Sequence, residues 1–169
     1  MQDIIFTERL TLKPVTREET RMLSESQAPA SLDTSDLQAS IDAHPDILTE
    51  TKELKRVLDI MASMYDRDVI CCGVFLNDEM IGFVNIVHPG GTFPLLQYEI
   101  KKDFQRRGFG HEAVSGFLQE YWKTWAEPVF ALIRPTNTVS IALIKKLGGT
   151  LVQPKSLLEE LLISTYRVS

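Results

Sequence analysis

Hydrophobic and polar positions recur along the chain with two different periods, and each period predicts a different kind of element. Short runs rich in Val, Ile, Leu and Phe, bounded by Gly, Asn, Asp or Pro, are typical of β-strands, whereas apolar residues spaced three and four apart are typical of amphipathic helices. The expected strands cover residues 4–6, 10–15, 69–76, 80–87, 95–100, 129–133, 150–153 and 163–168. The expected helices are one starting after Thr16 and others over residues 37–43, 48–64, 110–122 and 139–147.

Local signals define several of the element ends. Thr16 and Glu19 form a capping box at the start of the first helix, and Asn77-Asp78-Glu79 is a turn that joins residues 69–76 and 80–87 into a hairpin. Gly148 and Gly149 stop the last helix. The resulting order is an N-terminal helical insertion, a central antiparallel run and then strand-helix-strand-helix-strand, which predicts a mixed α/β fold.

Composition and charge narrow the function. The chain has 169 residues, 44% of them hydrophobic and 24% charged, which predicts one folded domain with a core. Its net charge of -5 disfavours a nucleic-acid partner, and no run is long and apolar enough for a membrane partner. The only two cysteines, Cys71 and Cys72, are adjacent, so they suit neither a disulfide framework nor a metal site and favour a cytoplasmic location.

The strongest chemical signal is the segment of residues 98–113, which joins a predicted strand to a predicted helix. Its loop holds two glycines and four cations: Gly108, Gly110, Lys101, Lys102, Arg106 and Arg107. Glycines let backbone N–H groups approach an anion, and the helix start adds free N–H groups and a positive dipole end. This combination predicts a pyrophosphate site; the alternative is a basic turn with a glycine at the start of a helix.

The same glycines satisfy the dinucleotide-binding fingerprint over residues 108–113, and the context argues against that interpretation. About 60 residues follow the loop, the preceding strands form a hairpin meander, and residues 129–133 end at Arg134-Pro135 without a ribose-binding carboxylate. A dinucleotide oxidoreductase is therefore a poor match. A P-loop is excluded because no Gly-Lys-Ser/Thr follows.

The run Gln105-Arg106-Arg107-Gly108-Phe109-Gly110 resembles the acetyl-coenzyme A loop of the GNAT superfamily of N-acetyltransferases. Two further motifs, in the right order, resemble the branch of ribosomal-protein alanine N-acetyltransferases. They are residues 7–14, similar to its opening strand, and Asn137-Thr138-Val139-Ser140 followed by Lys146-Leu147-Gly148-Gly149. The resemblance covers nearly the whole chain and is poorest over residues 24–68.

This resemblance implies a GNAT-like fold: a mostly antiparallel, twisted sheet that splays at the cofactor site, flanked by helices. It implies a single domain over residues 1–169, with an acetyl-coenzyme A core over 95–150 and a variable acceptor side over 16–68. The cofactor residues carried over are Tyr98 and Ile100, whose backbone would pair with pantetheine, the loop residues Gln105, Arg106, Arg107, Gly108, Phe109, Gly110 and His111, and Asn137. The alternative for Asn137 is a helix cap.

The catalytic residues are less well defined by the resemblance. Many relatives have a carboxylate where this chain has Leu95 and a tyrosine where it has Ile144. Glu99 is the candidate base, with solvated surface as the alternative, and His88 is chemically suitable as a base. Ser140 is the candidate acid, with a plain helix-start serine as the alternative.

The function expected from the resemblance is acetyl-coenzyme A-dependent N-acetylation of a primary amine, on a protein N-terminus or a small molecule. Transfer would be direct, in a ternary complex, without a metal; the alternative is a non-catalytic cofactor-binding or regulatory module. Residues 16–68 carry twelve acidic and six basic side chains, and an acidic acceptor side would attract an amine; the alternative is a set of solvated helix faces. A homodimer would match many relatives.

Overall fold

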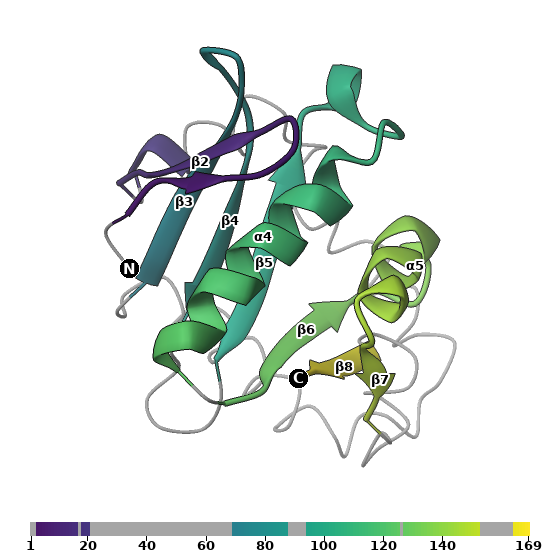
Figure 1. Cartoon of the computed structure of the whole chain (residues 1–169). Coiled ribbons are helices and arrows are strands. Elements are labelled where there is room, and N and C mark those ends of the chain that lie inside the picture. The colour runs from purple at the N-terminus through teal and green to yellow at the C-terminus, as the bar shows by residue number, and fades with distance from the viewer. Residues whose placement is uncertain (1–2, 17, 21–68, 88–93, 126, 153–163) are drawn as a thin grey trace.

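A computed structural model describes residues 3–16, 18–20, 69–87, 94–125, 127–152 and 164–169, arranged as a mixed α/β fold (Figure 1). Eight strands form one sheet in the order β1-β2-β3-β4-β5-β6-β8-β7. The strands are β1 (Ile5–Phe6), β2 (Thr11–Pro14), β3 (Val69–Leu76), β4 (Glu79–Val87), β5 (Leu95–Ile100), β6 (Val129–Ile133), β7 (Thr150–Leu151) and β8 (Ser164–Val168). The helices described in full are η3 (Lys102–Phe104), α4 (Phe109–Thr124) and α5 (Thr138–Lys146).

The predicted elements are confirmed wherever they lie in described residues, with small differences at their ends. The hairpin turn between β3 and β4 is tighter than predicted, because Leu76 pairs with Glu79 and only Asn77 and Asp78 remain between the strands. Asn77 adopts a φ of 53°, a left-handed conformation that asparagine tolerates well. The helices predicted over residues 37–43 and 48–64 lie outside the described residues.

The predicted capping box at Thr16 is present. The backbone N–H of Thr16 donates to Glu19 Oε2 at 2.7 Å, and the backbone N–H of Glu19 donates back to Thr16 Oγ1 at 3.3 Å. The Thr16 hydroxyl also donates to Glu19 Oε2, at 2.8 Å, and the two hydrogen bonds from the Thr16 N–H and hydroxyl hold the pKa of the Glu19 carboxyl below its ordinary value.

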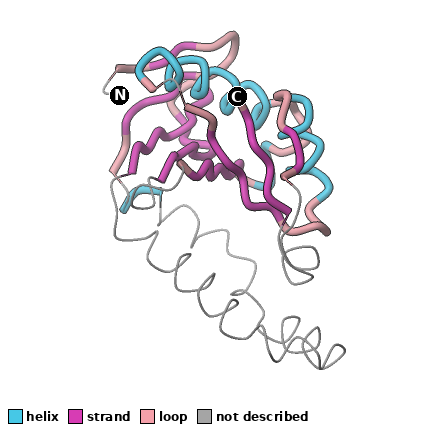
Figure 2. The backbone as a smooth tube through the Cα atoms, turned by 90° about the horizontal axis from the view of Figure 1, so that it is seen from below, coloured by secondary structure: helices cyan, strands magenta, loops and turns pink. Residues whose placement is uncertain are grey.

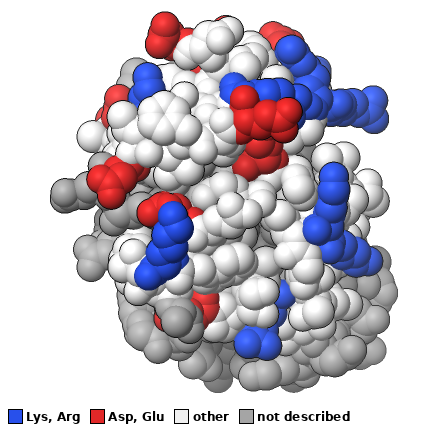
Figure 3. Space-filling model, viewed as in Figure 1, with Lys and Arg blue, Asp and Glu red and all other residues white. Residues whose placement is uncertain are grey.

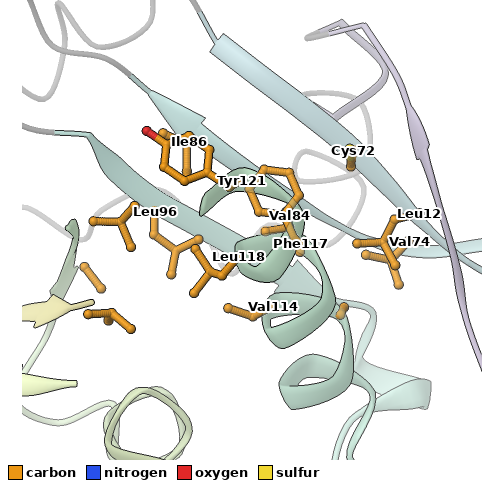
Figure 4. Packing of buried hydrophobic residues seen from close by; sticks show 14 of the residues in the cluster. Leu12, Cys72, Val74, Val84, Ile86, Leu96, Val114, Phe117, Leu118 and Tyr121 are labelled. Carbon is orange, nitrogen blue, oxygen red and sulfur yellow. The ribbon is translucent and has the colours of Figure 1, made fainter. Parts of the chain in front are cut away.

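The core lies between the sheet and α4, which crosses β4 and β5 (Figure 4). Phe117 and Tyr121 of α4 are fully buried against Val84 of β4 and Leu96 of β5. Burying a side chain of this size contributes about 1.5–3 kcal/mol, so this apolar stripe fixes α4 on the sheet. Both α4 and α5 lie on one face of the sheet (Figure 2).

The sheet opens between β5 and β6, the one parallel pair among the described strands. The two strands pair only where Leu95 meets Phe130, and the N–H of Phe130 donates to Pro94 O at 2.9 Å. By contrast, β5 pairs with β4 over its whole length, from Leu95 to Ile100. The expected splay of the sheet is therefore confirmed, and it leaves the β5 edge beyond Leu95 without a strand partner in the described part of the chain.

Strand alternation shows which backbone groups face this opening. Because Pro94 O points toward β6, the N–H and C=O groups of Leu96, Tyr98 and Ile100 point the same way. The N–H of Lys101 points to the other side, where it donates to Ile81 O at 2.8 Å. The opening is therefore lined by a row of backbone donors and acceptors from β5.

Candidate functional site

The loop after β5 is folded by its own polar groups. The N–H of Phe104 donates to Lys101 O at 2.8 Å and forms the single turn of η3. The Gln105 side chain then reaches back, and its Nε2 donates to Ile100 O at 2.8 Å. Gln105, a predicted cofactor residue, thus holds the loop against the end of β5.

Two left-handed residues turn the chain into the start of α4. Arg106 has a φ of 62° and Gly108 a φ of 82°, and Gly108 is the N-cap residue of the helix. The N–H of Glu112 is the first to donate within the helix, to Gly108 O at 3.1 Å. The first helical turn leaves its other N–H groups, including those of Gly110 and His111, available to an outside acceptor. The loop therefore presents an anion-binding set of backbone donors at the positive end of the α4 dipole.

The two loop glycines are needed for different reasons. Gly108 occupies a backbone region that residues with a Cβ rarely adopt. Gly110 lies where α4 approaches α5, and a Cβ there would lie 3.2 Å from Leu143 Cδ1 and 3.6 Å from Ile100 Cγ1. Close helix packing, as well as access to an anion, therefore explains the second glycine.

Three predicted site residues come together where α5 begins. The N–H of Ser140 donates to Asn137 Oδ1 at 3.1 Å, so Asn137 caps α5. The hydroxyl of Tyr98 donates to Ser140 O at 3.4 Å, linking β5 to α5 across the opening. Burial raises the pKa of the Tyr98 phenol, so Tyr98 keeps its proton near neutral pH.

The candidate base lies on the other face of the sheet. Tyr98 packs against the core below α4, so its neighbour Glu99 points to the opposite face. Glu99 is half-buried and lies opposite Phe83 of β4. The structure thus places Glu99 and the α5 residue Ser140 on opposite sides of β5, while His88 lies outside the described residues.

The two positions that depart from the commoner family pattern are part of the packing. Leu95 is 2% exposed and packs with Val87 and Phe130 on the face away from α4. Ile144 is fully buried in the main core. Neither side chain can take or give a proton, so the departures noted in the sequence are real chemical absences at these two positions.

An ion-pair cluster beside the loop was not predicted from the sequence. Arg9, in the turn between β1 and β2, forms a salt bridge with Glu112 in the first turn of α4, with Arg9 Nη2 2.7 Å from Glu112 Oε2. Thr7 Oγ1 donates to Glu112 Oε1 at 2.6 Å. The only sequence signal was that Thr7 and Arg9 lie in one family-like motif, while Glu112 lies in the helix that follows another. Figure 3 shows acidic and basic side chains side by side over this turn and the start of α4.

The charge state of Glu112 follows from these contacts. Burial would raise the pKa of its carboxyl, but the hydrogen bonds from Thr7 and Arg9 and the charge of Arg9 outweigh burial and lower it. Glu112 is therefore a carboxylate near neutral pH.

A groove of about 670 Å³ extends from the loop along the outer face of α4. Gly108 and His111 line one end, Lys123 lines the other, and β1 forms the opposite wall. Burial lowers the pKa of His111, and the nearby charge of Lys146 lowers it further, so His111 is neutral near pH 7.

Metal-binding clusters and membrane-spanning helices are both absent from the described ranges. Within them, no group of three or more His, Cys, Asp or Glu side chains is placed to hold a metal ion. No helix in these ranges has the length and apolar character needed to cross a bilayer.

Comparison with known proteins gives one family match. A family model described as an acetyltransferase (GNAT) domain matches residues 9–150. No curated protein sequence matches the chain.

Solved structures show where the fold recurs. An acetyltransferase from Agrobacterium tumefaciens has a TM-score of 0.62 at 20% identity, covering 99% of this chain and 94% of that one. An acetyltransferase from Salmonella typhimurium that modifies the N-terminal serine of a 50S ribosomal subunit protein has a TM-score of 0.62 at 15% identity, covering 98% of both chains. RimJ of Mycobacterium smegmatis, in complex with a CoA-disulfide, has a TM-score of 0.61 at 16% identity, covering 99% of this chain and 87% of that one.

Proposed function

Because the chain belongs to the GNAT family of acetyltransferases, we propose that it moves the acetyl group of acetyl-coenzyme A onto a primary amine in a ternary complex. The observation that carries the proposal is the joint presence of an opened β5 edge and an anion-binding helix start at the end of the same strand. The acceptor would be a protein N-terminus or a small-molecule amine, and the cytoplasm is the expected compartment.

The two halves of this site match the two ends of the cofactor. The backbone groups of Tyr98 and the N–H of Ile100 face the opening and could pair with the pantetheine amides as a strand would, while Ile100 O already accepts from Gln105 Nε2. The N–H groups of the loop and first helical turn, Arg106 to His111, could hold the pyrophosphate. Asn137 already caps α5 through its Oδ1, which leaves its Nδ2 to donate to the cofactor arm.

The reaction needs four events. A neutral amine attacks the thioester carbonyl, its proton leaves, the oxyanion is stabilised and the departing thiolate is protonated. We assign the last step to Ser140 and name Glu99 as the base, reached from the other face of β5. An α-amine has a pKa of about 8 and a lysine amine about 10.4, so an N-terminal acceptor places less demand on the base.

The acceptor side is inferred from charge and from a structural neighbour. Residues 16–68 carry twelve acidic and six basic side chains, which would attract a cationic acceptor. The Salmonella neighbour acts on a protein N-terminal serine, which supports a peptide N-terminus as the acceptor class to test first.

One observation favours a second function. Leu95 and Ile144 are buried apolar side chains where many relatives have ionisable ones. A protein that binds acetyl-coenzyme A without turning it over, as a regulatory module, would have no use for either group.

Titration calorimetry and a thiol-release assay separate these functions. We expect coenzyme A to bind and NAD not to bind, and we expect free thiol to appear with at least one member of a panel of peptides, amino acids, polyamines and other amines. Coenzyme A binding without turnover on any acceptor would support the module. If the protein binds no coenzyme A at high micromolar concentrations, both proposed functions are wrong.

Ser140→Ala tests the proposed acid. If Ser140 protonates the thiolate, turnover should fall about 100-fold while the Kd for coenzyme A stays within about twofold. Unchanged turnover on a good acceptor would leave Ser140 as a residue of the helix start only.

A further inference from the structure

We propose that Arg9 is a positioning residue of the cofactor site, resting on the function proposed above. Arg9 ties the anion-binding loop to the β1–β2 turn and neutralises a carboxylate that would otherwise repel the cofactor at the start of α4. It acts through Glu112 and Arg107 and does not contact the cofactor itself.

The turn that carries Arg9 is held rigidly. The N–H of Thr7 donates to Leu10 O at 2.9 Å, and the N–H of Leu10 donates to Thr7 Oγ1 at 3.1 Å. Gly116 lets α4 approach this turn, since a Cβ there would lie 2.7 Å from Thr7 Cγ2. Arg9 is therefore fixed over the first turn of α4 before any ligand arrives.

Arg9 donates hydrogen bonds to three acceptor atoms of the protein. Its backbone N–H donates to Glu112 Oε1 at 2.7 Å, and its Nε donates to Glu112 Oε2 at 2.7 Å. Its Nη1 donates to Arg107 O at 3.1 Å, which ties down the loop residue just before Gly108. This planar fork is a geometry that lysine cannot reproduce.

Two cation–π contacts with Phe109 also connect Arg9 to the loop. The Arg9 guanidinium lies 4.6 Å from the centroid of the Phe109 ring, and the Arg107 guanidinium lies 5.0 Å from the same centroid. Phe109, the first residue of α4, thus orders a loop arginine beside the N–H groups that face an anion. Cation–π contacts of this kind add to the fixed geometry of the loop.

The positive charge of Arg9 gives this residue its functional role. Glu112 is a carboxylate in the same helical turn as the N–H groups proposed for the pyrophosphate, and its side chain is 14% exposed. An unpaired carboxylate there would repel an anionic ligand and attract the same N–H groups. Paired with Arg9, it becomes an anchor for the loop with little net charge.

A double-mutant cycle on coenzyme A affinity tests this role. We expect Arg9→Ala to raise the Kd at least about tenfold, because it leaves the Glu112 charge unpaired and releases Arg107 O. Glu112→Gln should raise it only about twofold to threefold. In the double variant Arg9→Ala/Glu112→Gln, the Kd should return toward that of Glu112→Gln, because no unpaired carboxylate remains.

The double variant separates positioning from direct contact. If Arg9 held the pyrophosphate itself, the double variant would bind at least as weakly as Arg9→Ala, and the proposal would be wrong. An unchanged Kd in Arg9→Ala would also overturn it. If the wild-type protein binds no coenzyme A, the proposed function fails, and that outcome is distinct from either result.

Two further variants control for folding. Lys123→Ala removes a matched ion pair on the same helix, in which Lys123 Nζ lies 2.6 Å from Glu120 Oε2, and it should leave the Kd unchanged. Arg9→Lys keeps the charge but loses the bond to Arg107 O, so its Kd should lie between those of wild type and Arg9→Ala. If Arg9→Ala does not fold, Arg9→Lys decides: a Kd equal to the wild-type value would contradict the proposal.

Discussion

At the scale of single residues, two glycines form a matched pair. Gly108 and Gly148 both have a φ of 82°, but Gly108 lies in the loop before α4 and Gly148 follows α5 in open space. Alanine at either position should cost about 1–2 kcal/mol of stability, because left-handed backbone is unfavourable for a residue with a Cβ.

The two glycines should differ in ligand binding. We expect Gly108→Ala to weaken coenzyme A binding and Gly108→Glu to abolish it, since the glutamate adds bulk and negative charge to the anion site. Gly148→Ala and Gly148→Glu should leave the affinity unchanged in calorimetry. Equal affinities for the Gly108 and Gly148 variants would contradict the site.

Asn85 is a buried polar residue with an unsatisfied hydrogen-bond acceptor in the described structure. It is 7% exposed, and its Oδ1 has no hydrogen-bond partner among the residues that the structure describes. Removing a buried unsatisfied acceptor is stabilising, so Asn85→Leu should raise the free energy of unfolding by about 1 kcal/mol. Chemical denaturation would measure it, and a lower stability would show that the oxygen has a partner in solution.

The sequence predicted local geometry well where a residue had a local signature. The loop glycines and Asn137 were identified from short motifs, and Asn137 carries the predicted cap. The Arg9–Glu112 pair could not be predicted, because its partners lie 103 residues apart and each has a surface charge of the kind most chains carry.

At the scale of elements, the first turn of α5 offers a test of one residue with two proposed roles. Asn137→Ala should lose about 1 kcal/mol of stability with the cap. Asn137→Asp keeps an acceptor for the N–H of Ser140 but removes Nδ2, so it should keep the stability and weaken coenzyme A binding.

The Asp variant decides between the roles of Asn137. An unchanged Kd with wild-type stability would leave Asn137 as a cap alone. Asn137→Ser, which also caps helices but is shorter, serves as a second acceptor variant without a negative charge.

Element boundaries differed from prediction for local reasons. The predicted helix at residue 110 begins at Phe109, because Gly108 in its left-handed conformation already serves as the N-cap. Glu79 was predicted to lie in the turn but is the first residue of β4, because a two-residue turn is enough to connect the strands of a hairpin. The splay after Leu95 was expected from the resemblance, because the hydrophobic pattern alone cannot show where two buried strands separate.

At the scale of the whole molecule, Glu112 joins the β1–β2 turn to α4, and its protonation makes the stability of the fold depend on pH. Its folded-state pKa is below its ordinary value of about 4.3, so the stabilisation it provides is present above that value and lost as pH falls through the folded pKa. The thermal unfolding temperature should therefore decrease as the pH is lowered from about 5. This decrease should be smaller in Glu112→Gln.

The pKa values of His111 and Glu19 are also shifted, so their contributions to the pH dependence of stability must be distinguished from that of Glu112. The pKa of His111 is lowered, so His111 reduces stability as pH falls through its ordinary value of about 6.5, a higher window than that of Glu112. Glu19 acts in the same direction as Glu112 and is the matched control. An acid transition equally steep in Glu112→Gln and wild type would contradict the assignment.

The single pairing of Leu95 with Phe130 has a consequence for handling the protein. It leaves a strand edge in the middle of the sheet, and exposed edges are templates for pairing with other chains. A ligand that fills this edge would both stabilise the fold by mass action and block such pairing. Coenzyme A added during purification should therefore keep the protein monodisperse at concentrations where the unliganded chain aggregates, as light scattering would show.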